Sequence, residues 1–95
     1  MALGDVQTAI SSVANNAVLD IKPSSGVEWV IHNLLYGGAM ELYKTDGTNS
    51  IKVDSDTSNG GRIGVYLHCT NTVWYQIKNV SGASAILSYD GVQTK

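Results

Sequence analysis

The order of apolar and polar residues along the chain predicts β structure almost throughout. Runs rich in Val, Ile, Leu, Tyr and Trp are separated at short intervals by Gly, Asn, Asp and Ser. Short runs punctuated in this way are typical of β-sandwiches and barrels. The expected strands lie at about 17–22, 26–36, 39–45, 49–54, 62–70, 72–79 and 83–90. The predicted fold is therefore all-β, a small antiparallel β-sandwich or jelly-roll-like barrel of about seven to eight short strands.

The turn residues between these runs predict how the strands are joined. Asp46-Gly47 is the strongest signal, because both residues suit the positive φ angles of a type I′ hairpin turn. Gly37-Gly38, Asn59-Gly60-Gly61 and Ser81-Gly82 are also interpreted as hairpin turns. Since a tight turn joins strands that run in opposite directions, most neighbouring strands should be antiparallel.

The N-terminal segment fits more than one structure. Val6, Ile10 and Val13 have the spacing of a helical stripe, but the hydroxyl and β-branched residues among them disfavour a short helix. A first strand at about 6–13 is favoured, and a flexible arm that orders against a neighbour is the alternative. The predicted division is residues 1–16 as an N-terminal strand or arm and residues 17–95 as a single β-sandwich domain.

Alternation within the strands predicts a second apolar face. Residues i and i+2 share a face of a strand, so Trp29 and Ile31 are expected to pack in the core. The opposite face of the predicted strands stays apolar too, and apolar surface of this kind marks sites covered by another chain. The predicted interface residues are Val30, Leu34, Tyr36, Tyr66 and Trp74.

Composition narrows the class of protein. The chain has 95 residues, only 15% of them charged, with a formal net charge of −2. Six Lys and Arg residues give no electrostatic footprint for nucleic acid. No apolar run is long enough to span a membrane, and the first residues lack the basic region of a signal peptide. We therefore expect neither nucleic acid nor membrane as a partner, and synthesis in the cytoplasm.

No arrangement of residues predicts catalysis, a cofactor or a metal. The single cysteine, Cys69, shares a face with Val65 and Leu67, so we expect a buried and inert thiol although His32 and His68 could be considered as its base. The loop that begins at Asp54 and Asp56 is rich in oxygen ligands, but it lacks the Gly and Glu positions of an EF-hand. A solvated loop is favoured there over a weak calcium site. No enzyme is expected.

With the strands laid out, the chain from Pro23 to Lys95 resembles small β-sandwich virion proteins of tailed bacteriophages, of the capsid decoration or cement type. The resemblance rests on P-S-S-G-V-E-W-V-I-H-N at 23–33, E-L-Y-K-T-D-G-T-N-S at 41–50, H-C-T-N-T-V-W-Y-Q-I-K-N at 68–79 and S-Y-D-G-V at 88–92.

The resemblance implies a non-enzymatic structural protein that binds the assembled head and bridges capsomers. Its implied partners are further copies of itself, a trimer in preference to a dimer, and the major capsid protein. Its implied location is the outer capsid surface of the virion. The alternative is a small carbohydrate- or receptor-binding module of a phage tail or fibre, which would use exposed rings of Trp29 or Trp74 to stack on sugars.

Overall fold

The computed structural model describes residues 3–95 and contains eight strands and no helix within them. The strands are β1 (Val6–Val13), β2 (Val18–Ile21), β3 (Glu28–Tyr36), β4 (Met40–Thr45), β5 (Ser50–Asp56), β6 (Gly60–Thr70), β7 (Trp74–Asn79) and β8 (Ala85–Gln93). The all-β prediction is confirmed, and the strand expected at about 6–13 is β1. Residues 1–2 of the predicted N-terminal segment lie outside the described residues.

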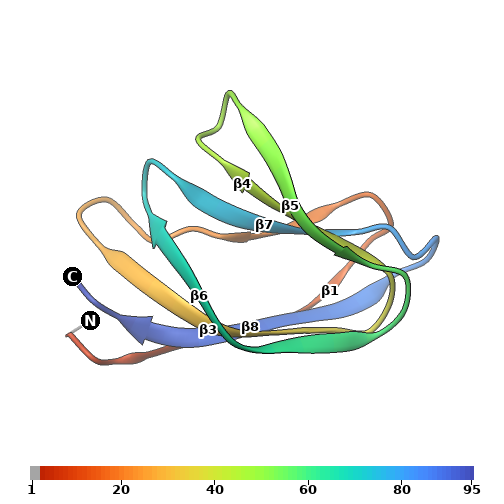
Figure 1. Cartoon of the computed structure of the whole chain (residues 1–95), viewed down its shortest axis with the longest axis horizontal. Helices are drawn as coiled ribbons and strands as arrows, with labels where there is room; N and C mark the ends of the chain where they lie inside the picture. The colour runs from red at the N-terminus through yellow and green to blue at the C-terminus, as the bar shows by residue number, and fades with distance from the viewer. Residues whose placement is uncertain (1–2) are drawn as a thin grey trace.

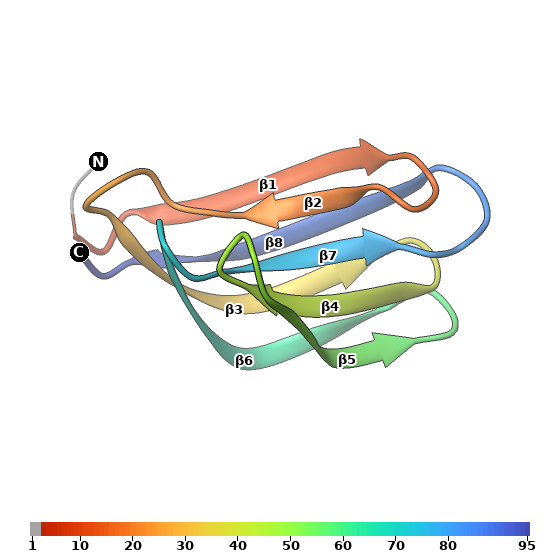
Figure 2. The same cartoon turned by 90° about the horizontal axis from the view of Figure 1, so that it is seen from above.

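The strands form two sheets that pack face to face (Figure 1). One sheet has the order β1-β8-β3-β6 and the other the order β2-β7-β4-β5, with every described neighbouring pair antiparallel. Figure 2 shows the second sheet lying over the first, with β1 and β2 along one margin and β5 and β6 along the other. An eight-stranded double sheet with this winding is a jelly roll.

Most connections run between the sheets rather than within one. Among the described strands, β4 and β5 are the consecutive strands that pair as a hairpin. The hairpin predicted at Asp46-Gly47 is confirmed, although positive φ occurs at Gly47 alone (91°), as at the first central residue of a type II′ turn. The hairpins predicted at Gly37-Gly38, Asn59-Gly60-Gly61 and Ser81-Gly82 are wrong. These turns reverse the chain, but each carries it to the other sheet, and a local turn signal does not specify which sheet the next strand joins.

The core lies between the two sheets. It consists of the buried side chains of Val13, Ile21, Ile31, Leu34, Tyr36, Met40, Leu42, Leu67, Cys69, Ile77, Leu87 and Tyr89. Trp29 is half-buried and packs against this core, with its ring 6.3 Å from that of Tyr89 between centroids. The expectation that Trp29 and Ile31 face inward is thus confirmed.

A β-bulge in β3 changes which side chains face the core. Ile31 pairs with Gly91 of β8, but the next pair joins Asn33 to Asp90, so His32 is an extra residue on β3. An extra residue inverts the alternation of side chains that follow it. Leu34 is consequently buried in the core (0% exposed), and Leu35 lies on the outer face instead.

Gly91 allows the backbones to approach at this bulge. A Cβ atom built on Gly91 would lie 2.1 Å from the carbonyl oxygen of Val30 and 2.6 Å from the Cα of Ile31. No other residue fits that space without a shift of the backbone. β8 continues through Gly91 to Gln93, whereas the sequence predicted that the strand ends at residue 90.

Candidate interaction surface

The outer face of the β1-β8-β3-β6 sheet carries a set of exposed apolar side chains. We call this set the apolar face, and it consists of Val6, Ile10, Leu35, Ile63, Tyr66 and Ile86. Four of its members, Val6, Ile10, Ile63 and Tyr66, are more than 70% exposed. Val30 and Val92 are half-buried between them, since Val92 pairs with Val6 on one side and with Val30 on the other.

The apolar side chains come from neighbouring strands rather than from one strand. The register of β1, β8 and β3 aligns Ile10 and Leu35 with Ser88, which lies between them. A shallow groove of about 290 Å³ at this end of the sheet is lined in part by Ile10, Leu35 and Ile86. The face therefore draws on four strands, and its apolar side chains lie on either side of a polar row made of Thr8, Asp90 and Asn33, in which Asn33 Nδ2 donates to Asp90 Oδ1.

The bulge extends into β6 and places Ile63 and Tyr66 outside. Three residues of β6, 64–66, lie opposite the single residue His32. Gly64 accommodates this mismatch in the left-handed region (φ 75°), and its N–H donates to Asn33 Oδ1 at 3.2 Å. The Tyr66 ring makes an edge contact with His32, with centroids 5.3 Å apart.

The structure brings together two of the five predicted interface residues. Val30 and Tyr66 lie on the outer face of the β1-β8-β3-β6 sheet, as expected. Assigning Leu34 and Tyr36 to that face is wrong, because the bulge turns both into the core, where they are 0% and 4% exposed. Trp74 lies on β7 of the other sheet, so it does not join them.

Sequence reasoning missed most of the apolar face. Val6 and Ile10 had a visible signal, because both fall on the outward side of β1, where they alternate with Thr8 and Ser12. Leu35 and Ile63 had none, because strict alternation assigns both to the core side.

The outer face of the β2-β7-β4-β5 sheet differs in kind. Asp20 Oδ1 accepts hydrogen bonds from Trp74 Nε1 at 3.2 Å and from Gln76 Nε2 at 2.7 Å. The ammonium of Lys22 lies 4.1 Å from the centroid of the Trp74 ring. We call this surface the charged face.

A second polar cluster on the same face joins β4 to β5. The hydroxyl of Tyr43 donates to Glu41 Oε1 at 2.6 Å, and Lys52 Nζ lies 3.5 Å from Glu41 Oε2. The Tyr43 hydrogen bond is the main cause that lowers the pKa of Glu41, and the Lys52 charge acts in the same direction. The same hydrogen bond raises the pKa of Tyr43.

An ion-pair network ties the two sheets together at the β5–β6 margin. Arg62 of β6 donates from Nε to Asp54 Oδ2 at 2.8 Å and from Nη1 to the Tyr36 hydroxyl at 2.7 Å. The Tyr36 hydroxyl in turn donates to Asp56 Oδ2 at 2.7 Å. The Arg62 hydrogen bond lowers the pKa of Asp54, the Tyr36 hydrogen bond lowers that of Asp56, and burial raises the pKa of Tyr36.

The same network accounts for the carboxylates considered for calcium. Asp54 and Asp56 are bonded to Arg62 and Tyr36, and within residues 3–95 no three acidic, His or Cys side chains gather into a metal cluster. The arrangement is that of a structural ion pair between sheets.

Cys69 is buried, as expected, and its burial accounts for the raised pKa of its thiol. Its side chain is 1% exposed, and loss of solvation raises the pKa of its thiol to about 12. Its Sγ donates to the Leu67 carbonyl oxygen at 3.6 Å. His32 instead contacts Tyr66, and His68 is exposed on the outer face. These side chains therefore do not form a thiol–imidazole pair.

Neither tryptophan has the exposure that sugar stacking requires. The Trp29 ring packs against the core, and its Nε1 is buried with no hydrogen-bond partner among the described residues. The ring of Trp74 is half-buried and has Lys22 over it. Trp29 faces the core from one sheet and Trp74 lies on the outer side of the other, so the two rings do not form a joint platform.

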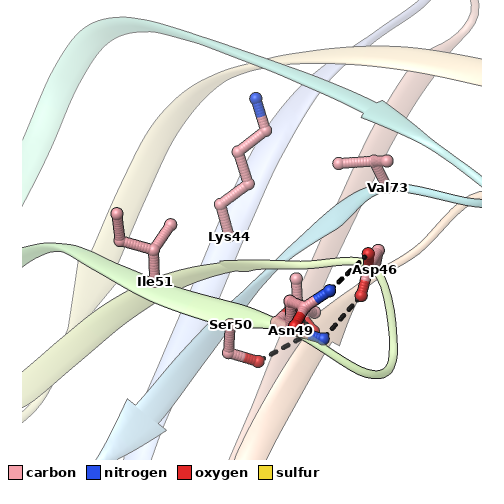
Figure 3. Close-up of a pocket in the computed structure, with 7 residues that line it drawn as sticks. Lys44, Asp46, Asn49, Ser50, Ile51 and Val73 are labelled. Atoms are coloured by element: carbon pink, nitrogen blue, oxygen red, sulfur yellow. Dashed lines mark hydrogen bonds between the residues drawn. The ribbon is translucent and has the colours of Figure 1, made fainter.

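The hollow beside the β4–β5 hairpin offers little recognition chemistry. It measures about 250 Å³, and Figure 3 shows the Lys44 side chain rising between Ile51 and Val73. The Asp46 carboxylate at its rim is already bonded to Asn49, whose N–H donates to Oδ1 at 2.6 Å. These bonds lower the pKa of Asp46 and hold the loop.

Comparison with known proteins identifies no family for this chain. No protein-family model matches the chain, and no curated protein matches it. In the part of the chain that the structure covers, no helix could cross a membrane. The class that the structure defines is a small antiparallel jelly-roll sandwich with one charged and one apolar outer face.

Proposed function

We propose that this protein is a non-enzymatic structural protein of a tailed-phage virion, a decoration (cement) protein that binds the assembled head and bridges capsomers. The apolar face is the observation that carries the proposal. The sequence motifs at 23–33, 41–50 and 68–79 add the resemblance to small virion proteins.

The area of the apolar face suits a protein partner. Side chains exposed to this degree present on the order of 100 Å² each, so six of them offer roughly 600 Å² of apolar surface, against about 800 Å² per partner in a standard interface. Exposed apolar side chains gathered in this number on one face of a sheet favour an interaction site. A head surface is a suitable partner, because many copies bound side by side gain affinity from multivalency.

The proposed partners are the major capsid protein and further copies of the chain. The proposed location is the outer capsid surface, after synthesis in the host cytoplasm. The resemblance favours three copies over two, since decoration proteins often occupy local three-fold positions. The spacing of residues does not itself require three.

Binding to heads tests the proposal. Purified protein is sedimented with heads of the encoding phage that lack it, and bound protein is measured by titration. Ile63→Lys and Tyr66→Lys place an unpaired charge in the proposed contact, so each should weaken binding at least about tenfold. Ile51→Lys is the matched control, because Ile51 is 63% exposed on β5 of the other sheet.

Each outcome of the binding experiment either supports or contradicts the proposal. Loss of binding for the two apolar-face variants with full binding by Ile51→Lys supports the proposal. Wild-type protein that does not sediment with heads contradicts it, and so does unchanged binding by Ile63→Lys and Tyr66→Lys.

A further inference from the structure

The four edge strands of the sandwich differ in how they are protected against pairing. An edge strand presents unpaired N–H and C=O groups, and proteins block such edges with short strands, charges, Pro or bulges. The edges here are β1 and β6 of one sheet and β2 and β5 of the other.

Three of these edges carry protective features. β2 has four residues and is followed closely by Pro23. β5 carries Lys52, Asp54 and Asp56, and its pairing with β4 is irregular. β6 is interrupted by the bulge at Gly64.

β1 carries none of these features. Its eight residues, V-Q-T-A-I-S-S-V, include no charge, Pro or Gly. Its register with β8 runs without interruption from Val6↔Val92 to Val13↔Ala85. Within residues 3–95 it pairs with β8 on one side and with no strand on the other, and Figure 2 shows it at the margin of the sandwich.

The register shows which backbone groups are free. Gln93 N–H donates to the Asp5 carbonyl, and Gly37 N–H donates to the Ile86 carbonyl. Odd-numbered residues of β8 therefore bond to β1 and even-numbered ones to β3, because bonding alternates along an antiparallel strand. Odd-numbered residues of β1 bond to β8 in turn, so Thr8, Ile10 and Ser12 direct their N–H and C=O groups outward.

We propose that two copies of the chain pair antiparallel through β1 and join their four-stranded sheets into one continuous sheet. The occupant is a second copy because the edge is self-complementary under a two-fold axis and offers no charge to a different strand. Pairing also joins the apolar faces of both copies, since Val6 and Ile10 border the seam.

The symmetry restricts the register. Outward-directed residues must bond to outward-directed residues, so even-numbered positions pair with even-numbered positions. The two registers with the greatest overlap place either Ala9 or Ile10 on the two-fold axis. The proposal rests on the proposed function only for the expectation that copies associate, and it gives two copies instead of the three that the resemblance favours.

A proline at an outward-directed N–H tests the pairing. Ile10→Pro removes a donor that the proposed dimer uses and no donor of the β1–β8 ladder. Ile10→Ala is the matched control, because it removes the side chain and keeps the N–H. Molar mass is measured by light scattering at micromolar concentrations, with circular dichroism to verify the fold.

The wild type and Ile10→Ala should have twice the chain mass of 10.1 kDa, and folded Ile10→Pro should have the single-chain mass. A wild-type protein that is monomeric at all concentrations overturns the proposal. A folded Ile10→Pro variant that keeps the mass of the wild type, whether that is a dimer or a trimer, overturns it too. If Ile10→Pro does not fold, Ile10→Lys decides, because it keeps the N–H and places like charges at or beside the axis. A folded Ile10→Lys dimer then overturns the pairing.

Head binding is scored separately from mass. Dimers that do not bind heads contradict the proposed function and leave the β1 pairing intact. Monomers that bind heads contradict the β1 pairing and leave the proposed function intact.

Discussion

The two outer faces of this sandwich cover the same core but present different kinds of side chain to the solvent. On the charged face, Asp20 accepts a hydrogen bond from Trp74, and the ammonium of Lys22 lies over the Trp74 ring. Glu41 bonds to Tyr43 and Lys52. On the apolar face, Ile10, Ile63 and Tyr66 are each more than 70% exposed.

This difference distinguishes the residues that the fold requires from those that are available for binding. The inner faces of both sheets are sufficient to form the core, so neither outer face is dictated by the fold. An antiparallel sheet that faces water usually alternates apolar-in and polar-out. The charged face follows that rule more closely, with Val18 exposed at 40%, whereas Val6, Ile10, Ile63 and Tyr66 of the apolar face are each more than 70% exposed, which is why we propose that binding occurs there.

The largest expected effect comes from Gly91, which lies at the bulge that turns Leu35 and Ile63 onto the apolar face. In Gly91→Ala, the new Cβ would collide with the Val30 carbonyl at 2.1 Å, in a region where backbone surrounds it. We expect the loss of a native fold or a destabilisation above about 3 kcal/mol, as for severe overpacking. Urea unfolding measures it. Gly82→Ala is a comparison in open space, where only the left-handed φ of 91° is strained, and it should cost clearly less.

The second prediction concerns two neighbouring leucines on opposite sides of β3. Leu34→Ala removes a fully buried side chain and should cost about 2–5 kcal/mol in the free energy of unfolding. Leu35→Ala removes a side chain that is 45% exposed, so it should cost less than about 1.5 kcal/mol in the isolated protein. The same unfolding measurement serves both. Equal losses would show that the bulge does not set the two faces as described.

These leucines also show how much of the molecule the sequence could predict. Alternation located the strands and assigned Ile31, Leu67 and Cys69 to the core, because those residues precede or follow the bulge in regular strand geometry. It assigned Leu34 and Ile63 to the wrong faces, because the bulge depends on how β3 meets β8 and β6. Pairing across sheets was equally hidden, since Gly37-Gly38 signals a reversal and not the strand that follows.

The third prediction concerns the network that holds the sheets together at the β5–β6 margin. Hydrogen bonds lower the pKa values of Asp54 and Asp56 in the folded state. Their stabilising contribution is therefore full above the ordinary carboxyl pKa of 3.8 and is lost as the pH falls through the lowered values. The melting temperature of the wild type should fall below about pH 4.

Arg62→Gln tests the source of that acid sensitivity. Without the guanidinium, the melting temperature should be lower at neutral pH and should fall less steeply in acid. Lys44→Gln is the control, because it removes the same charge from a side chain that lies over the Tyr75 ring, 5.9 Å from its centroid. An acid response of Arg62→Gln as steep as that of Lys44→Gln would assign the effect to net charge rather than to the network.

The smallest expected effect lies on the charged face, where Lys22 covers Trp74. The ammonium sits 4.1 Å from the ring centroid, and an exposed cation–π contact contributes about 0.5–1 kcal/mol. Lys22→Met keeps the apolar stem and removes the charge, so urea unfolding should show a loss of that size, and the loss should shrink at high salt. Because the proposed contact lies on the apolar face, the variant should also keep wild-type mass and wild-type binding to heads. Reduced binding by Lys22→Met, with the fold intact, would place part of the contact on the charged face and remove the division of roles between the two sheets.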